Sequence, residues 1–516
     1  MNLDWFKHNW LLLLVVMLAG IFRLVGVLKS DLPTGDEINC YIYNAQQFAE
    51  HGRIPPLSDH PGVSMIYGVV ITVTEAFCIT LSGVVAANIV TVISGVLSVL
   101  FVYLALLHFS NRQTAFLASL ILSVFPGCYF AVRGDLSLYF LFLSAFLFSL
   151  SCLSAKPSWR MAMITGILGG CLYLCRSDGL YLVILTFILA FFVLKEIRLY
   201  IPLTAIAFCL LLGLFLVIRF GVMGNLGTGT GQRAFDAFYQ AEGLLDHKGG
   251  SWQDYTERGL KRYGLSEKYG NSMARLVVEN HYQVYERIKR NLLLVSKYIR
   301  DASGIDSGWI VLILACCMLN TRILKMAIIS VLPCIFTSCI YLAFYFQRTY
   351  FVMFSFGLVL GCTAGLSALV FFISNKFKFQ AHAFTGCLII GALVASLMGY
   401  ETYRSFPGSK KTTTAKRYWD SLIFLKENCV NGGYKYFAYD HAGSRSMYIY
   451  TGGGEPEISQ GEVEGNEVEQ VLGKLRLKGV RFVLAQKENH TLWGLSDHSS
   501  VVFSNKRDDV RIIALK

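Results

Sequence analysis

The chain has 516 residues, of which 54% are hydrophobic and only 16% are charged, and its mean hydropathy is +0.50. This composition excludes an ordinary soluble protein of the same length and predicts a polytopic α-helical membrane protein. The formal net charge of +12 would suit a nucleic-acid-binding protein. Many lysines and arginines lie instead in short turns between apolar segments, which is a signal of membrane topology, so we expect no nucleic-acid partner.

Apolar segments long enough to cross a membrane recur through residues 1–400 and predict about eleven transmembrane helices. They lie at 10–28, 86–108, 114–130, 138–154, 161–175, 180–194, 201–220, 309–319, 323–345, 350–374 and 381–400. Residues 64–79 are also apolar, but they follow a Pro-Gly turn and include Glu75. We therefore expect a helix on the membrane surface there and no transmembrane helix.

The basic residues of the short turns give an orientation. With a cytoplasmic N-terminus, all of them fall on the cytoplasmic side, as the positive-inside rule requires. They are Lys7, Arg112, Lys156, Arg160, Lys195, Arg198, Arg322, Lys325, Lys376 and Lys378. An odd number of spans then places the C-terminus outside. The low proline count of 10 and the lack of a eukaryotic retention signal favour a bacterial inner membrane.

The first outer loop, residues 33–80, is the first place where polar chemistry gathers. Asp36 and Glu37 open a helical pattern with one apolar face, which predicts a helix lying on the membrane surface. Gly52 and a Pro-Pro pair end that helix, and a tight turn then brings Asp59 and His60 back. A helix cap at Asp36 would explain the acidic pair equally well.

Further charged groups fall on the same predicted face of the membrane, at the ends of apolar helices. They are Arg133, Asp135, Arg176, Asp178 and Arg348. Taken alone, each arginine suits a side chain that reaches the lipid headgroups. Charges in such places are costly unless they are paired or functional, so their convergence on one face predicts a site.

Two larger extramembrane segments complete the organisation. Residues 221–307 form a second large outer loop with a helical pattern, and residues 401–516 have the composition of a soluble periplasmic α/β domain. In that domain we expect helices at 415–427 and 467–477 and strands at 434–439, 480–485, 501–504 and 510–514. The glycines at 452–454 are not followed by Lys-Ser or Lys-Thr, which excludes a phosphate-binding loop.

With these residues in view, the first 375 residues or so resemble the GT-C superfamily of integral membrane glycosyltransferases, which use a polyprenyl-phosphate sugar as donor. The matching elements are a helix ending in Arg23, the pair Asp36-Glu37, Gly52 and the turn Asp59-His60-Pro61. Arg133 and Asp135 match the family's second-loop acid, Arg176 to Gly179 matches a basic turn, and Gln347 to Tyr350 resembles a late Arg-Tyr element. The branches compared are the protein O-mannosyltransferases and the lipid A aminoarabinose transferases.

This chain departs from the family pattern at two positions. Gly62 stands where the family usually has a second proline, and Thr349 separates Arg348 from its tyrosine. No charged group is lost at either position, but the sugar and the subfamily stay open.

The resemblance implies roles for the site residues. Asp36 would be the general base, with Glu37 as a supporting acid. His60, Arg133, Arg176 and Arg348 would bind the donor phosphate. Asp59 and Asp135 would suit a divalent metal, Mg or Mn, since carboxylate oxygens are the ligands these ions prefer; some GT-C enzymes need a metal and others do not.

The resemblance thus implies an inverting transferase with the polyprenyl-phosphate sugar as donor. The acceptor would be a hydroxyl of a lipid-linked or envelope glycan, such as O-antigen, lipopolysaccharide or another surface glycan, and the helices would contact membrane lipids. A lipid A or protein O-glycosyl modifying transferase is the alternative within the class. A lipid-linked sugar transporter or flippase is the alternative outside it, but it should carry ionisable residues near the midplane of paired halves, and no such halves are seen.

Overall fold

The computed structural model describes residues 3–29, 41–52, 61–77, 79, 83–124, 135–223, 235, 238–242, 252–303, 307–343, 348–377, 421, 424–425, 427–428, 435–438, 468–477, 479–486, 495, 499–504 and 510–515. The chain divides into two compact units. One comprises Met1–Gly26 and Thr91–Ser405, and the other comprises Val27–Val90 and Phe406–Lys516.

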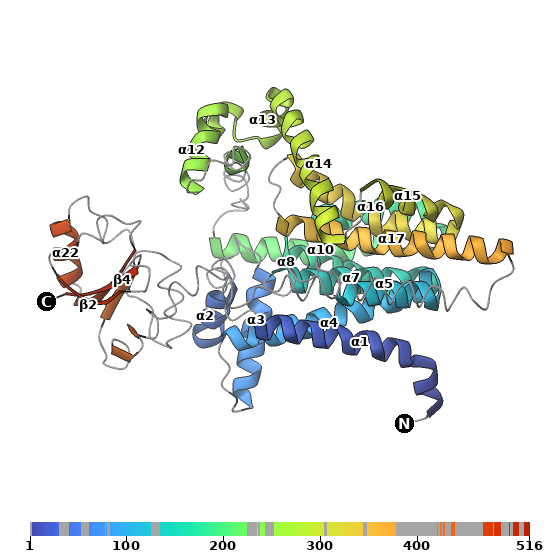
Figure 1. The fold of residues 1–516 in the computed structure, drawn as a ribbon, viewed down its shortest axis with the longest axis horizontal. Helices are drawn as coiled ribbons and strands as arrows, with labels where there is room; N and C mark the ends of the chain where they lie inside the picture. Colours follow the sequence, from blue (N-terminus) through green and yellow to red (C-terminus); the bar gives the residue numbers. More distant parts are fainter. Residues whose placement is uncertain are drawn as a thin grey trace. The chain divides into compact units, whose positions relative to one another are not determined.

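The first unit is built mainly from apolar helices (Figure 1). They are most of α1 (Leu3–Lys29) and of α4 (Gly83–Phe109), with α5 (Arg112–Val124), α7 (Asp135–Ala155), α8 (Trp159–Cys175), α9 (Gly179–Val193), α10 (Ile201–Met223), α15 (Ser307–Ala315), α16 (Thr321–Ala343) and α17 (Arg348–Phe377). Among the described residues, α1, α4, α7, α10 and α16 are long and apolar enough to cross a membrane. The shorter α5, α8 and α9 and much of α17 are also apolar. The predicted polytopic helical architecture is confirmed.

Ten of the predicted membrane segments coincide with these helices, and the segment predicted at 381–400 lies outside the described residues. The prediction that the first helix ends at Arg23 was wrong, because α1 continues to Lys29. Residues 24–28 are mostly apolar and contain no helix breaker other than one glycine, so nothing in that sequence ends the helix at Arg23.

Glycines set the close approach of several helix pairs. α8 packs against α10, and a Cβ atom on Gly166 would overlap the backbone carbonyl oxygen of Thr204. α17 packs against α15 in the same way, where a Cβ atom on Gly365 would overlap the carbonyl oxygen of Ile313. Small residues at such contacts let backbones approach closely, which is how helices associate in a membrane without a hydrophobic driving force.

The 221–307 segment, which belongs to the first unit, is helical where it is described. It contains α12 (Trp252–Tyr263), the 3₁₀ turn η4 (Ser266–Tyr269), α13 (Met273–Glu279) and α14 (His281–Ser303). Its own core consists largely of aromatic side chains: Phe235, Phe238, Tyr239, Tyr263, Tyr269, Leu276 and Val284. α14 extends beyond this core and packs against α16 and α17.

The second unit contains the first-loop helices and the C-terminal sheet. α2 (Tyr43–His51) packs against α3 (Pro61–Ala76) and ends at Gly52. Gly52 has φ of 64°, and its backbone N–H donates to the carbonyl oxygens of Gln47 and Phe48, so it ends the helix as predicted.

The C-terminal sheet has four strands in the order β1-β2-β4-β3. β1 (Lys435–Ala438) is parallel to β2 (Val480–Gln486), while β4 (Val510–Ala514) is antiparallel to both β2 and β3 (Ser500–Ser504). Leu472 and Leu475 of α22 (Val468–Leu477) pack with Val483 and Ile513, and Leu425 packs with Phe482, Leu484 and Ile512. Alternate residues of β2 and β4 thus enter two apolar clusters, and all four predicted strands and the 467–477 helix are confirmed.

Candidate functional site

The predicted site residues are described to different extents. Asp36, Glu37, Asp59, His60 and Arg133 lie outside the described residues. Asp135 is the first residue of α7 and Arg348 the first residue of α17, which places their backbones at helix starts. Arg176 has a described side chain with hydrogen-bond partners in the turn between α8 and α9 and in α16.

Arg176 lies in the turn between α8 and α9. Its backbone N–H donates to the carbonyl oxygen of Leu172 (3.1 Å), and its own carbonyl oxygen accepts from the N–H of Gly179 (3.0 Å). A Cβ atom on Gly179 would lie 2.8 Å from the Leu172 carbonyl oxygen, so this turn needs glycine at that position. The tight turn fixes the backbone from which the Arg176 side chain extends.

The Arg176 guanidinium is held by a carboxylate and a phenol. Its Nε lies 3.3 Å from both carboxylate oxygens of Asp178, and its Nη2 donates to the hydroxyl of Tyr341 in α16 (3.3 Å). The Tyr341 hydroxyl in turn donates to Oδ2 of Asp178. Asp178 is only 5% exposed, so its charge is removed from water and stabilised by these two partners. Asp178 thus holds the Arg176 side chain in place.

An aromatic ring completes this cluster. The Arg176 guanidinium carbon lies 6.0 Å from the ring centroid of Tyr139, which is fully buried in α7. Cations at this distance from an aromatic face are attracted to it. We call Tyr139, Arg176, Asp178 and Tyr341 the Arg176 cluster. It brings together side chains from α7, the α8–α9 turn and α16.

A second buried arginine, Arg23 of α1, lines a cavity with Phe140, the residue of α7 that follows Tyr139. Arg23 is 7% exposed and lines a small cavity with Gly95, Ser98 and Val99 of α4, Leu122 of α5, Ser137 and Phe140 of α7 and Phe356 of α17. The cavity volume is about 10 Å³, roughly enough for one water molecule. Phe140 stacks on Phe356 with ring centroids 5.2 Å apart, which joins α7 to α17 at this level.

The start of α7 therefore connects several of the predicted residues. Asp135 is its first residue, Ser137 and Phe140 line the Arg23 cavity, and Tyr139 lies against Arg176. Arg348 begins α17, the helix that contributes Phe356 to the same cavity. Phe356 lies eight residues after Arg348, which is about 12 Å along the helix, so the structure places Arg23 and Arg176 beside the first two turns of α7 and leaves the position of Arg348 relative to them a prediction.

Sequence reasoning missed Arg23 and Arg219 as buried cations. Arg219 lies in α10 and is 3% exposed. A signal was available for both, because an arginine inside an apolar membrane segment is costly and is retained for a reason.

The described residues contain no group of three or more His, Cys, Asp or Glu side chains that could hold a metal ion. The metal was expected at Asp59 and Asp135. Asp59 and the side chain of Asp135 lie outside the described residues, so this expectation is not tested. The metal therefore stays a prediction.

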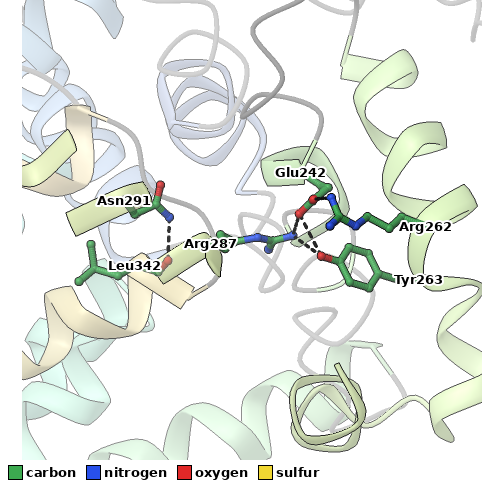
Figure 2. A network of polar contacts seen from close by, with 6 residues as sticks. All are labelled: Glu242, Arg262, Tyr263, Arg287, Asn291 and Leu342. Carbon is green, nitrogen blue, oxygen red and sulfur yellow. Dashed lines mark hydrogen bonds and ion pairs between the residues drawn. The ribbon is translucent and has the colours of Figure 1, made fainter. Parts of the chain in front are cut away.

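The 221–307 segment has a charged network of its own (Figure 2). Glu242 accepts from Arg287 (2.5 Å), from Tyr263 (3.0 Å) and from Arg262. The Arg287 side chain is 1% exposed, and its guanidinium lies 3.9 Å from the ring centroid of Phe238. Burial raises the pKa of Glu242, but the hydrogen bond and charge of Arg287, with Arg262 and Tyr263, outweigh it and bring the pKa below the usual 4.5. Glu242 is therefore ionised at neutral pH.

No protein-family model matches the chain, and no curated protein matches it significantly. Solved structures do. ArnT from Cupriavidus metallidurans bound to undecaprenyl phosphate matches with a TM-score of 0.60 at 11% identity, over 98% of each chain.

The Archaeoglobus fulgidus oligosaccharyltransferase also matches. Its complex with Zn and sulfate has a TM-score of 0.55 at 13% identity, over 92% of this chain and 68% of that chain. The same organism's oligosaccharyltransferase AglB, with an inhibitory peptide and a dolichol-phosphate, has a TM-score of 0.53 at 14% identity, over 99% and 75%.

ArnT and AglB are GT-C proteins. The chain therefore has the GT-C fold, as its resemblance implied, and it is a multi-pass membrane protein.

Proposed function

From the GT-C fold, we propose that the chain is an inverting glycosyltransferase of the bacterial inner membrane. It moves a sugar from a polyprenyl-phosphate donor to a hydroxyl of an envelope glycan, such as O-antigen or lipopolysaccharide, on the periplasmic face. The similar structures bound to undecaprenyl phosphate and to dolichol-phosphate support a lipid phosphate as the carrier of the sugar. The reaction itself is argued from the site, because a fold alone does not determine a function.

The observation that carries this proposal is the Arg176 cluster. The side chain of Arg176 is 12% exposed, and its orientation is fixed by Asp178 and Tyr341. A phosphate that leaves with growing negative charge needs a preoriented cation in a water-poor place, and a guanidinium matches phosphate geometry better than an ammonium does. This arrangement suits the departing polyprenyl phosphate.

The reaction is a single displacement. The acceptor hydroxyl oxygen attacks the anomeric carbon, its proton passes to the carboxylate of Asp36, and the bond from that carbon to the phosphate oxygen breaks with its electron pair on the phosphate. The products are an inverted glycoside and polyprenyl phosphate. Glu37 supports Asp36, and His60, Arg133 and Arg348 act on the phosphate with Arg176. If Mg or Mn binds, Asp59 and Asp135 would hold it, and it would neutralise phosphate charge.

The test is sugar transfer by purified full-length protein in detergent, with a panel of synthetic polyprenyl-phosphate sugars. We expect wild type to use at least one donor and Asp36→Asn to be slower by about a hundredfold or more, because the amide cannot accept the proton. Glu279→Gln is the matched control, since Glu279 is an acid of α13 paired with Arg275 at 2.6 Å, and it should retain wild-type activity. Protease accessibility of the C-terminal domain verifies membrane insertion of each variant.

Three other outcomes are decisive. Equal activity of wild type and Asp36→Asn would leave Asp36 as a helix cap and move the base to Glu37 or Asp135. Failure with every donor would refute the transferase. Movement of lipid-linked sugar across a vesicle membrane, without transfer, would favour the transporter.

A lipid A or protein O-glycosyl modifying transferase is the second candidate. One observation favours its lipid A form, namely that the match to ArnT, a lipid A aminoarabinose transferase, extends over 98% of both chains. Offering lipid A, an O-antigen acceptor and a peptide in parallel with one donor separates the candidates, because only the true acceptor should become labelled.

A further inference from the structure

The last turn of α16 is joined to the 221–307 segment by one side chain. The amide Nδ2 of Asn291 in α14 donates to the backbone carbonyl oxygen of Leu342 at 2.7 Å (Figure 2). Asn291 is 3% exposed and Leu342 is 7% exposed. The last four carbonyls of a helix lack partners within the helix, and a buried carbonyl needs one. Asn291 therefore caps α16 from another helix.

The residue before Leu342 is Tyr341, which belongs to the Arg176 cluster. Its hydroxyl donates to Asp178 and accepts from Arg176. The turn of α16 that Asn291 caps is thus the turn that carries one of the two side chains holding Arg176.

The rotation of α14 about its own axis is also fixed. Arg287 lies one turn before Asn291 on the same buried face, and it is bound by Glu242 and stacked on Phe238. A charge buried in this way tolerates little displacement, since moving it would leave an unpaired ion in an apolar interior. The network of the 221–307 segment therefore fixes the side of α14 that faces α16.

We propose that Asn291 and Tyr341 are positioning residues for Arg176. The proposal rests on the phosphate-binding role of Arg176 in the proposed function. Asn291 holds the last turn of α16, that turn places the Tyr341 hydroxyl, and the hydroxyl, with Asp178, sets the direction of the guanidinium. Through these two residues the folded state of the 221–307 segment determines whether Arg176 is oriented for a lipid phosphate.

The test measures binding of undecaprenyl phosphate alone to the full-length protein in lipid nanodiscs. We expect Tyr341→Phe to weaken binding about fivefold, since it removes the two hydrogen bonds of the hydroxyl, and Asn291→Ala about threefold, since it removes the one hydrogen bond to Leu342. Because Asn291 acts on Arg176 through Tyr341, the double variant Asn291→Ala/Tyr341→Phe should bind undecaprenyl phosphate about fivefold more weakly than wild type. Independent effects would instead multiply to roughly fifteenfold. With a donor that wild type uses, kcat should fall while the thermal midpoint stays within a few degrees.

Two control variants remove comparable groups without touching α16. The Tyr239 hydroxyl donates to the Gly264 carbonyl oxygen (2.9 Å), and the Asn280 amide donates to the Leu276 carbonyl oxygen (2.9 Å), both inside the 221–307 segment. Tyr239→Phe and Asn280→Ala should bind undecaprenyl phosphate within about twofold of wild type. If Asn291→Ala does not fold, Asn291→Leu keeps the side-chain volume without a donor, and Tyr341→Phe removes only one oxygen.

The outcomes separate this inference from the proposed function. If Arg176→Ala binds weakly but Tyr341→Phe and Asn291→Ala bind like wild type, the positioning role is overturned and the transferase stands. If the double variant binds undecaprenyl phosphate about fifteenfold more weakly than wild type, the two substitutions act independently. That result would overturn the proposal that Asn291 acts on Arg176 through Tyr341. If wild type neither binds undecaprenyl phosphate nor uses any donor, the proposed function itself fails.

Discussion

At the scale of single residues, two buried carboxylates each have a partner from a distant part of the chain. Asp178 pairs with Arg176, two residues away, and with Tyr341, 163 residues away. Glu242 pairs with Arg287, 45 residues away, and the Arg287 guanidinium lies over an aromatic ring. Breaking such a buried pair from one side typically costs about 3–5 kcal/mol, so these residues should tolerate substitution poorly.

Replacement of Arg176 tests whether a positive charge alone is sufficient for use of the donor. Arg176→Lys keeps the positive charge but loses the planar fork that reaches both Asp178 and Tyr341, so donor kcat/KM should fall about tenfold, and Arg176→Ala should fall further. Arg198→Lys is the matched control, because Arg198 is a half-buried arginine that donates to the carbonyl oxygens of Phe191 and Phe192, away from the Arg176 cluster. Equal activity of Arg176→Lys and wild type would show that a charge without the fork is sufficient.

The Glu242 network should make the 221–307 segment sensitive to acid. Because the folded-state pKa of Glu242 lies below the usual 4.5, its contribution to stability is complete above that value and is lost as the pH falls through the folded-state pKa. The contribution of the ionised group is absent in Glu242→Gln. In limited proteolysis, the segment should therefore be cleaved faster in Glu242→Gln than in wild type. The ratio of the two cleavage rates should be constant at pH 5–8 and smaller at lower pH. A difference that grew on acidification would contradict the assignment.

At the scale of elements, helix contacts depend on the absence of side-chain atoms. Gly166 of α8 has the Thr204 carbonyl of α10 where a Cβ atom would lie, whereas Gly213 of α10 has nothing within 4 Å. The two glycines lie in neighbouring apolar helices but in opposite surroundings.

Alanine at these two glycines should act in opposite directions. Gly166→Ala forces α8 away from α10 and should destabilise the protein by about 1–3 kcal/mol. Gly213→Ala adds a methyl group in open space and restricts the unfolded chain, so it should be neutral or stabilising by up to about 1 kcal/mol. Thermal unfolding of both variants in the same detergent measures this, and a Gly166→Ala protein as stable as wild type would disprove the close contact.

The sequence was informative about elements and much less so about the contacts between them. Strand β4 was predicted with its observed ends, and α22 to within one residue, because alternation and turn residues are local signals. Asn291 could not be predicted as a cap for Leu342, since the two are 51 residues apart and an asparagine on a helix has no local mark of its partner. The Arg176–Asp178 pair is a local contact because both residues lie in one turn, whereas the role of Tyr341 depends on how α16 packs against α9.

At the scale of the whole molecule, the fold is retained with few shared residues. Identity to the similar solved structures is 11–14% for those compared, yet the match to ArnT extends over 98% of both chains. In a membrane protein, the order of apolar segments and charged turns carries the architecture, and many residues at each position meet that requirement.

Membrane orientation is the prediction that belongs to this scale. Alkaline phosphatase, which is active only in the periplasm, should be inactive when fused after residue 156, because Lys156 and Arg160 mark a cytoplasmic turn. Fusions after residue 178 and residue 280 should be active. The opposite pattern would invert the topology and place the Arg176 cluster on the cytoplasmic side.

The spacing of the Arg176 cluster along the chain has a consequence for biogenesis. Arg176 and Asp178 leave the ribosome almost together, whereas Tyr341 follows 163 residues later, which at 5–20 residues per second is roughly ten to thirty seconds. During that interval the translocon receives the α8–α9 hairpin with its two opposite charges already side by side. Each charge alone would oppose insertion by about 2.5–3.5 kcal/mol at the centre of a helix, so the adjacent pair crosses as a nearly neutral unit. The Arg176–Asp178 pair, which later helps to orient the guanidinium, thus first lowers the cost of inserting the nascent α8–α9 hairpin into the bilayer.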